Sequence, residues 1–120
     1  VVVVAHKRLD DGTLALLDRH PRVVAALAGD THDHAIAPRA GVWQVTTASL
    51  ADFPQQARMF RLVATRGGGV ALETWVVDHA GGGLAGTARE LAFIDSQGGR
   101  PAGSRGRASD RNARLFAPGG

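Results

Sequence analysis

The stretch that decides the fold is "VVVVAHKRLDDGTLALLDRHPRVVAALAG", which covers residues 1–29. Its first five residues form a run rich in β-branched side chains, which predicts a strand buried on both faces. The segment "LALLDRH" (14–20) predicts a short helix that Pro21 ends. The segment "RVVAALAG" (22–29) predicts a second buried strand. A strand, a helix and a strand in this order favour a βαβ unit with two parallel strands.

The pattern changes after this unit and predicts antiparallel strands. Two short runs, "HAIAP" (34–38) and "VWQVTTA" (42–48), enclose a hairpin turn. Two longer runs, "ARMFRLVAT" (57–65) and "VALETWVVDH" (70–79), enclose a glycine-rich loop and predict a second hairpin. We therefore expect the strands to join a mixed sheet. The predicted fold class is α/β, with mixed β-sheet layers and flanking helices.

The C-terminal part of the chain has a different composition. The segment "AGTARELAFID" (85–95) has helical periodicity and closes the predicted domain, which spans residues 1–95. Residues 96–111 are rich in Gly, Ser and Arg, which predicts a flexible linker. Residues 112–120 predict a final strand and a tail.

Composition limits the classes of protein and of site. The 120 residues suffice for one modest domain, and the absence of cysteine excludes disulfides and thiolate metal sites. No apolar stretch reaches the roughly 20 residues that span a bilayer, and no signal peptide is visible, so we expect no membrane partner and leave the localisation open. Residues 1–96 carry nine Lys or Arg against ten Asp or Glu, whereas residues 97–120 carry five Arg against one Asp. The positive charge belongs to the tail, which argues against nucleic acid as a partner.

Histidines and aspartates follow both of the predicted parallel strands. His6 comes directly after the first strand, and Asp30, His32 and His34 follow the second. Ligands of open α/β sheets collect at the carboxyl ends of strands, and the crossover places these two ends side by side. Nitrogen and oxygen ligands without sulfur suit Zn, Mn or Fe(II) and indicate a catalytic metal site. The stretch "GDTHDH" (29–34) is also typical of a turn, so both interpretations stay open.

Four blocks, in this order along the chain, carry a family resemblance: "VVVVAHKRL" (1–9), "HPRVVAALAGDTH" (20–32), "AGVWQVTTASLADFPQQARMFRLV" (40–63) and "WVVDHA" (75–80). They resemble consecutive blocks of the calcineurin-like metallophosphoesterases, and more narrowly an actinobacterial-type branch of that family. The branch has an Asp-aromatic-Pro-Gln-Gln-x-Arg segment, which here is residues 52–58, and a later Val-Asp-His, which here is residues 77–79. The resemblance implies the C-terminal part of a metallophosphoesterase-type α/β/β/α sandwich.

The resemblance also implies a site with two divalent metal ions, Mn, Fe or Zn, that hydrolyses a phosphomonoester or a phosphodiester. His6 corresponds to a ligand of one metal ion and His32 to a ligand of the other. Asp30 stands where the family has the first histidine of a Gly-His-x-His block, and a carboxylate there changes reach and metal preference. The implied metal ligands are therefore His6, Asp30 and His32, with no further catalytic residue.

Arg58 is a candidate contact with the phosphoester substrate, because arginine suits bidentate binding of oxyanions. The alternative is a solvated arginine on a strand face.

Three other ligand blocks of the family are absent from the sequence: Asp-x-His, Gly-Asp with the bridging aspartate, and Asn-His-Asp/Glu. Three ligands without the bridging carboxylate are too few for two metal ions. We therefore expect this chain to be the C-terminal fragment of a phosphoester hydrolase, with the N-terminal half of the domain as its partner. The alternative is a catalytically inactive fragment or degenerate paralogue that acts as a structural or interaction domain.

Overall fold

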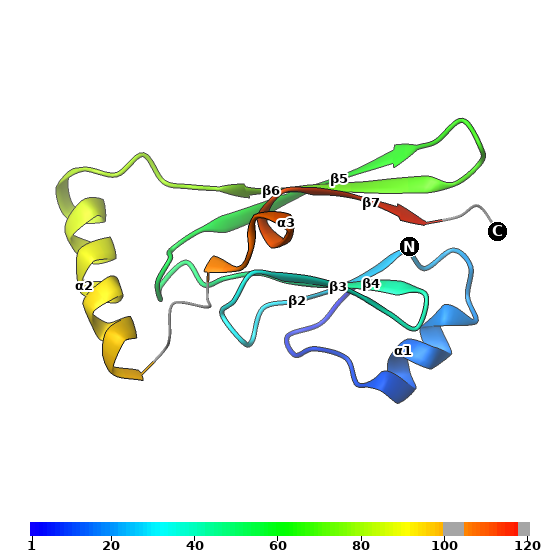
Figure 1. Cartoon of the computed structure of the whole chain (residues 1–120), viewed down its shortest axis with the longest axis horizontal. Coiled ribbons are helices and arrows are strands. Elements are labelled where there is room, and N and C mark those ends of the chain that lie inside the picture. Colours follow the sequence, from blue (N-terminus) through cyan, green and yellow to red (C-terminus); the bar gives the residue numbers. More distant parts are fainter. Residues whose placement is uncertain (100–104, 118–120) are drawn as a thin grey trace.

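Two β-sheets form the body of the protein in the computed structural model, which describes residues 1–99 and 105–117. Figure 1 shows the sheets as two layers, with helix α1 (Asp11–Asp18) below one of them and helix α2 (Gly83–Gly99) at one end of the molecule. The coarse prediction of a mixed α/β fold with sheet layers and helices is confirmed. Among the described residues, no helix is long and apolar enough to cross a membrane.

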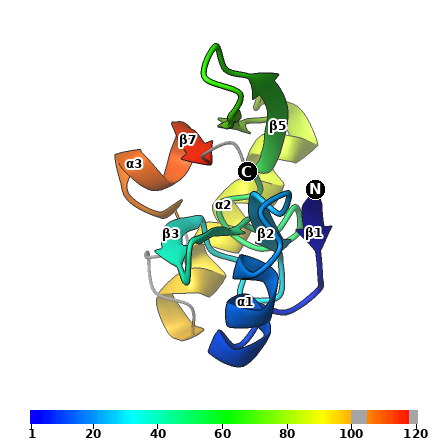
Figure 2. The ribbon, with the colours of Figure 1, turned by 90° about the vertical axis from the view of Figure 1, so that its right-hand side faces the viewer.

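The first sheet, here called sheet A, contains the predicted βαβ unit. Strands β1 (Val2–Val4) and β2 (Ala25–Ala28) are parallel neighbours, and α1 connects them. Strand β4 (Val42–Thr46) lies parallel to β2 on its other side, and β3 (Ala35–Arg39) pairs antiparallel with β4, which confirms the first hairpin. The sheet order is therefore β1-β2-β4-β3. In Figure 2, β1 and β3 lie at opposite edges of this sheet.

Helix α1 covers the outer face of sheet A. The Asp10 carboxylate caps it by accepting a hydrogen bond from the Thr13 backbone N–H at 2.9 Å. Leu14 is fully buried and packs with Ala26 and Val42, as the helical pattern predicts. Ala15, in contrast, is exposed, because this two-turn helix touches the sheet along one narrow stripe only.

Strand β1 differs from its prediction. It was expected to be buried on both faces, but Val4 is 76% exposed and Val1 is 66% exposed. The reason is its position at the edge of sheet A, where a strand has a neighbour on one side only.

The second sheet, sheet B, is antiparallel throughout. It contains β5 (Ala57–Ala64), β6 (Val70–Val77) and β7 (Ala113–Ala117) in that order. The second predicted hairpin is therefore confirmed, and so is the final strand. The two hairpins do not share one mixed sheet, however: the first joins sheet A and the second builds sheet B.

The predicted linker over residues 96–111 has regular structure at both ends. Its first four residues complete α2, and its last four form helix α3 (Ala108–Arg111). The middle of the predicted linker, residues 100–104, lies outside the described residues. Helix α3 forms because the Asp110 carboxylate accepts hydrogen bonds from the backbone N–H groups of Arg107 (2.9 Å) and Ile36 (3.0 Å). Asp110 thereby links α3 to β3, and α3 lies beside β3 in Figure 2.

The main core lies between the two sheets. Val24, Ala25 and Val45 from sheet A pack against Leu72 and Leu115 from sheet B. Leu72 lies on β6, the central strand of sheet B, pairs with Leu62 on one side and Leu115 on the other, and is 2% exposed. Burial of these aliphatic side chains is the main attraction between the two layers.

We predict that Leu72→Ala destabilises the protein by about 2–5 kcal/mol, because it removes buried methyl groups and leaves a cavity between the sheets. The matched control is Leu62→Ala on the neighbouring strand, since Leu62 is 53% exposed. The control is expected to cost less than about 1 kcal/mol. Urea unfolding monitored by circular dichroism measures both changes, and equal losses in the two variants would contradict this packing of the sheets.

Candidate functional site

The carboxyl ends of β1 and β2 bring His6 and Asp30 together. The backbone carbonyl of His6 accepts hydrogen bonds from the N–H groups of Gly29 (3.1 Å) and Asp30 (3.0 Å), which continues the parallel pairing beyond the strands. At this position Nε2 of His6 lies 3.0 Å from Oδ1 of Asp30. The His6 side chain is 76% exposed and the Asp30 side chain 38%, so the pair is open to solvent. The predicted convergence of these two residues is present.

His32 is directed to a different partner. Its backbone has a φ of +53°, and its Nδ1 donates to Oδ2 of Asp52 from the loop that follows β4. Asp52 is itself held in place, because Ser49 Oγ accepts hydrogen bonds from the backbone N–H groups of Ala51 (3.0 Å) and Asp52 (3.1 Å). The 52–58 block is thus linked to the "GDTHDH" loop through an imidazole and a carboxylate.

Only two of the three predicted metal ligands converge. Within residues 1–99 and 105–117, no group of three or more His, Asp or Glu side chains is placed to hold a metal ion. The pair of imidazole nitrogen and carboxylate oxygen from His6 and Asp30 has the chemistry that Zn, Mn and Fe(II) accept. These residues therefore fit one part of a metal centre and not a complete one.

The loop that carries Asp30 and His32 also contains a turn, since the His32 backbone N–H donates to the Gly29 carbonyl at 3.4 Å. Asp33 accepts a hydrogen bond from Arg8 Nη2 at 2.9 Å, and Thr31 donates its hydroxyl to the same carboxylate. Arg8 Nη2 donates further to Thr46 Oγ1 at the end of β4, at 3.2 Å. These contacts connect the segment after β1 and the end of β4 with the loop after β2. The stretch from Gly29 to His34 can therefore form a turn and also contribute residues to a site.

Arg58 is not the solvated strand-face arginine of the sequence analysis. It is 9% exposed, and its guanidinium donates to Thr74 Oγ1 (3.1 Å), to His34 Nδ1 (3.1 Å) and to the backbone carbonyls of Arg111 (3.2 Å) and Asp110. Burial lowers the pKa of Arg58 to about 10, against the attraction of Asp110. Because protein acceptors occupy both Nη1 and Nη2, Arg58 holds β5, β6 and α3 together and does not present its guanidinium to a substrate at the surface.

His34 lies inside the protein beside this guanidinium. It is 1% exposed, and its Nδ1 accepts hydrogen bonds from Arg58 and from the Ala48 backbone N–H at 3.3 Å. Burial, followed by the charges of Arg58 and Arg111, lowers the pKa of His34 to about 4, although Gln56 acts in the opposite direction. The imidazole is therefore neutral, with its proton on Nε2. That atom and Oε1 of Gln56 make no hydrogen bond of normal geometry in the described part of the chain.

Two residues that organise this region, Asp52 and Asp110, are not among the predicted site residues. Asp52 could have been noticed through the Ser49-x-x-Asp52 spacing, which is typical of a side-chain cap. The identity of its partner His32, 20 positions away, has no local signal. Asp110 lies in the predicted linker, where nothing in the composition indicates a contact with β3.

Comparison of the chain with protein-family models, with curated proteins and with solved structures found no match. The resemblance of the motifs to the metallophosphoesterases therefore stands as a prediction.

We predict that the free energy of unfolding falls between about pH 6.5 and pH 4, because the unfolded chain protonates His34 near its ordinary pKa of 6.5 whereas the folded protein does so near 4. This stability is fully present above pH 6.5 and is lost as the pH falls toward 4. Its size is on the order of 3 kcal/mol. Urea unfolding at a series of pH values measures the slope.

The slope is expected to become shallower in His34→Gln, which removes the titrating group, and to persist in His20→Gln, since His20 is exposed. An unchanged slope in His34→Gln would show that another group causes the pH dependence.

Proposed function

We propose that the chain is the C-terminal part of a metal-dependent phosphoester hydrolase domain of the calcineurin-like metallophosphoesterase type. The observation that carries the proposal is the 3.0 Å approach of His6 Nε2 to Asp30 Oδ1 at the adjoining ends of two parallel strands. Both residues belong to blocks on which the family resemblance rests. A two-layer β arrangement with parallel strands that end at the candidate site is compatible with a metallophosphoesterase sandwich.

The second support is the link between two further blocks. The "GDTH" block and the "DFPQQ" block are separated in sequence, yet His32 and Asp52 join them through a hydrogen bond. A hydrogen bond from one ring nitrogen to a carboxylate fixes the tautomer and the ring orientation of a histidine, and such a bond is common among histidines that bind metal ions.

In the proposed site, His6, Asp30 and His32 supply ligands to divalent ions, Mn, Fe or Zn. Such ions lower the pKa of water and neutralise the negative charge that develops on phosphoryl oxygens during hydrolysis. The remaining ligands, including a bridging carboxylate, come from the N-terminal half of the domain. Asp30 is shorter than the family's histidine and is paired with His6, which favours weak metal binding by this chain alone.

The role of Asp30 is tested by Asp30→His. We expect it to tighten Zn²⁺ binding by about tenfold, or ~1.4 kcal/mol, because a second imidazole replaces a carboxylate that competes for His6. His6→Ala is expected to abolish binding. Isothermal titration calorimetry with Zn²⁺, together with NMR spectra of the histidine side chains, measures both effects.

The matched control is His20→Ala, an exposed histidine at the end of α1, which should leave Zn²⁺ binding unchanged. If His6→Ala binds Zn²⁺ as well as the unmodified chain and Asp30→His brings no gain, the metal assignment is wrong. That result would favour the alternative, an inactive fragment that acts as a structural or interaction domain.

The hydrolytic activity is tested on a polypeptide in which the missing ligand blocks are joined to this chain. It is expected to hydrolyse 4-nitrophenyl phosphate in the presence of Mn²⁺ or Zn²⁺, and His32→Ala is expected to reduce kcat by at least about 100-fold, since a metal ligand is lost. Equal turnover by the His32→Ala variant would remove His32 from the site.

A further inference from the structure

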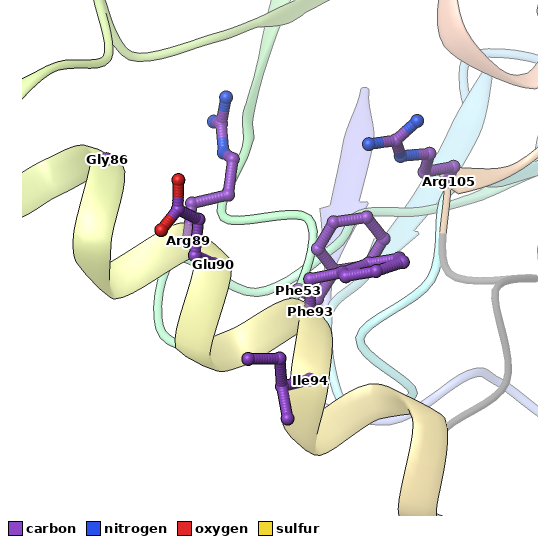
Figure 3. Close-up of a pocket in the computed structure, with 7 residues that line it drawn as sticks. All are labelled: Phe53, Gly86, Arg89, Glu90, Phe93, Ile94 and Arg105. Atoms are coloured by element: carbon purple, nitrogen blue, oxygen red, sulfur yellow. The ribbon is translucent and has the colours of Figure 1, made fainter.

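A cleft of about 610 Å³ lies between helix α2 and the loop that contains Phe53. Its size is within the range of sites for small ligands, which are about 300–1,000 Å³. Figure 3 shows two phenyl rings in the middle of the cleft, with side chains of α2 on one side and Arg105 on the other. The lining residues used below are Phe53, Arg89, Glu90, Phe93, Ile94 and Arg105.

Two phenylalanines form an aromatic floor. Phe53 is 5% exposed, and its ring lies edge-to-face with that of Phe93, with centroids 5.2 Å apart and an interplanar angle of 62°. Phe93 is 46% exposed, and Ile94 beside it is 65% exposed. The floor is therefore fixed on the Phe53 side and open on the α2 side, where a flat apolar group can pack against Phe93.

The charged groups around this floor differ in sign from one side to the other and would orient a ligand that carries an anionic group. The guanidinium carbon of Arg105 lies 4.7 Å from the centroid of the Phe53 ring. Arg89 donates to the Asp78 carboxylate and, at 3.4 Å, to the Gln55 carbonyl. Asp78 balances the charge of Arg89, so in the described part of the chain Arg105 is the unbalanced cation of the lining, and Glu90 lies across the rings from it in Figure 3. A ligand would turn its anionic group toward Arg105 and away from Glu90.

The cleft is linked to one of the candidate metal ligands, His32, through the neighbour of Phe53 in the sequence. Phe53 directly follows Asp52, whose carboxylate accepts a hydrogen bond from His32. In Figure 1, α2 lies at the end of the molecule toward which the parallel strands of sheet A run. A molecule in the cleft would therefore lie next to the loops that carry the proposed site.

We propose that the cleft binds the aromatic group of a phosphoester substrate, with the ring on Phe93 and Phe53 and its anionic group attracted by Arg105. The substrate class of the proposed hydrolase would then be phosphoesters of aromatic alcohols. The inference about the cleft therefore rests on the proposed function. An aromatic ring of the ligand that packs against Phe93 would bury apolar surface and make an edge-to-face contact. The Arg105 guanidinium would add a charge-assisted hydrogen bond to the anionic group of the ligand.

The experiment measures binding of 2-naphthyl phosphate to the whole chain in EDTA, by naphthyl fluorescence and by shifts of backbone NMR signals. Without metal ions no hydrolysis interferes. We expect saturable binding with shifts at the cleft, and Phe93→Ala and Arg105→Gln should each weaken it by about tenfold. Arg105→Gln should leave the binding of uncharged 2-naphthol unchanged.

The matched control is a similar pair outside the cleft, on the outer face of sheet B. There the Arg114 guanidinium carbon lies 5.4 Å from the ring of Phe116, which is 60% exposed. Phe116→Ala and Arg114→Gln should leave the affinity for 2-naphthyl phosphate unchanged. Circular dichroism of all four variants shows that the fold is retained.

Absent saturation, unchanged affinity in Phe93→Ala, or an equal loss in the Phe116→Ala control would each overturn the proposal. The result for 2-naphthyl phosphate can be separated from the result of the Zn²⁺ titration. If Zn²⁺ binds and 2-naphthyl phosphate does not, the hydrolase proposal stands and the aromatic substrate class is rejected. If 2-naphthyl phosphate binds in the cleft and Zn²⁺ does not bind, the cleft is supported and the hydrolase proposal is rejected.

Discussion

The buried guanidinium of Arg58 is the constraint that joins the parts of this protein. A buried charge is tolerated only where hydrogen bonds replace those it made with water. Here the acceptors come from three places: the imidazole of His34 next to β3, the hydroxyl of Thr74 on β6, and backbone carbonyls of α3. The two sheets and the helix before β7 must therefore keep one relative arrangement. Burial, together with the adjacent positive charge, lowers the pKa of His34 and keeps it neutral, which lets its Nδ1 act as an acceptor.

The candidate site depends on a simpler feature, the parallel pairing of β1 with β2. Two backbone hydrogen bonds to the carbonyl of His6 extend that pairing beyond the strands and hold the Asp30 carboxylate beside the imidazole. The loop after β4 supplies Asp52 to His32 in the same region. Because these groups lie on loops at the ends of a packed sheet, they combine solvent access with fixed positions, as functional residues commonly do.

Helix α2 gives this end of the molecule a second surface with a cleft. Arg89 contacts Asp78 and Phe93 contacts Phe53, and these contacts hold the helix in place. Two of its apolar side chains remain exposed, Leu84 at 90% and Leu91 at 61%. The helix thus leaves an open aromatic cleft beside the loop that carries Asp52. The proposed substrate cleft and the proposed metal ligand His32 are linked through one short segment, residues 52–53.

The sequence by itself determined the βαβ unit, the two hairpins and the final strand, though not helix α3, because hydrophobic periodicity, the proline after the first helix and the rule for crossovers act over short distances. That was enough to bring His6 and Asp30 together. The tertiary structure alone decided that the second hairpin forms its own sheet with β7, that β1 is an exposed edge, that His32 joins Asp52, and that Arg58 and His34 are buried together. Each of these depends on contacts between residues 20 or more positions apart, where the pairing follows from packing and from the need to satisfy buried polar groups rather than from any local pattern.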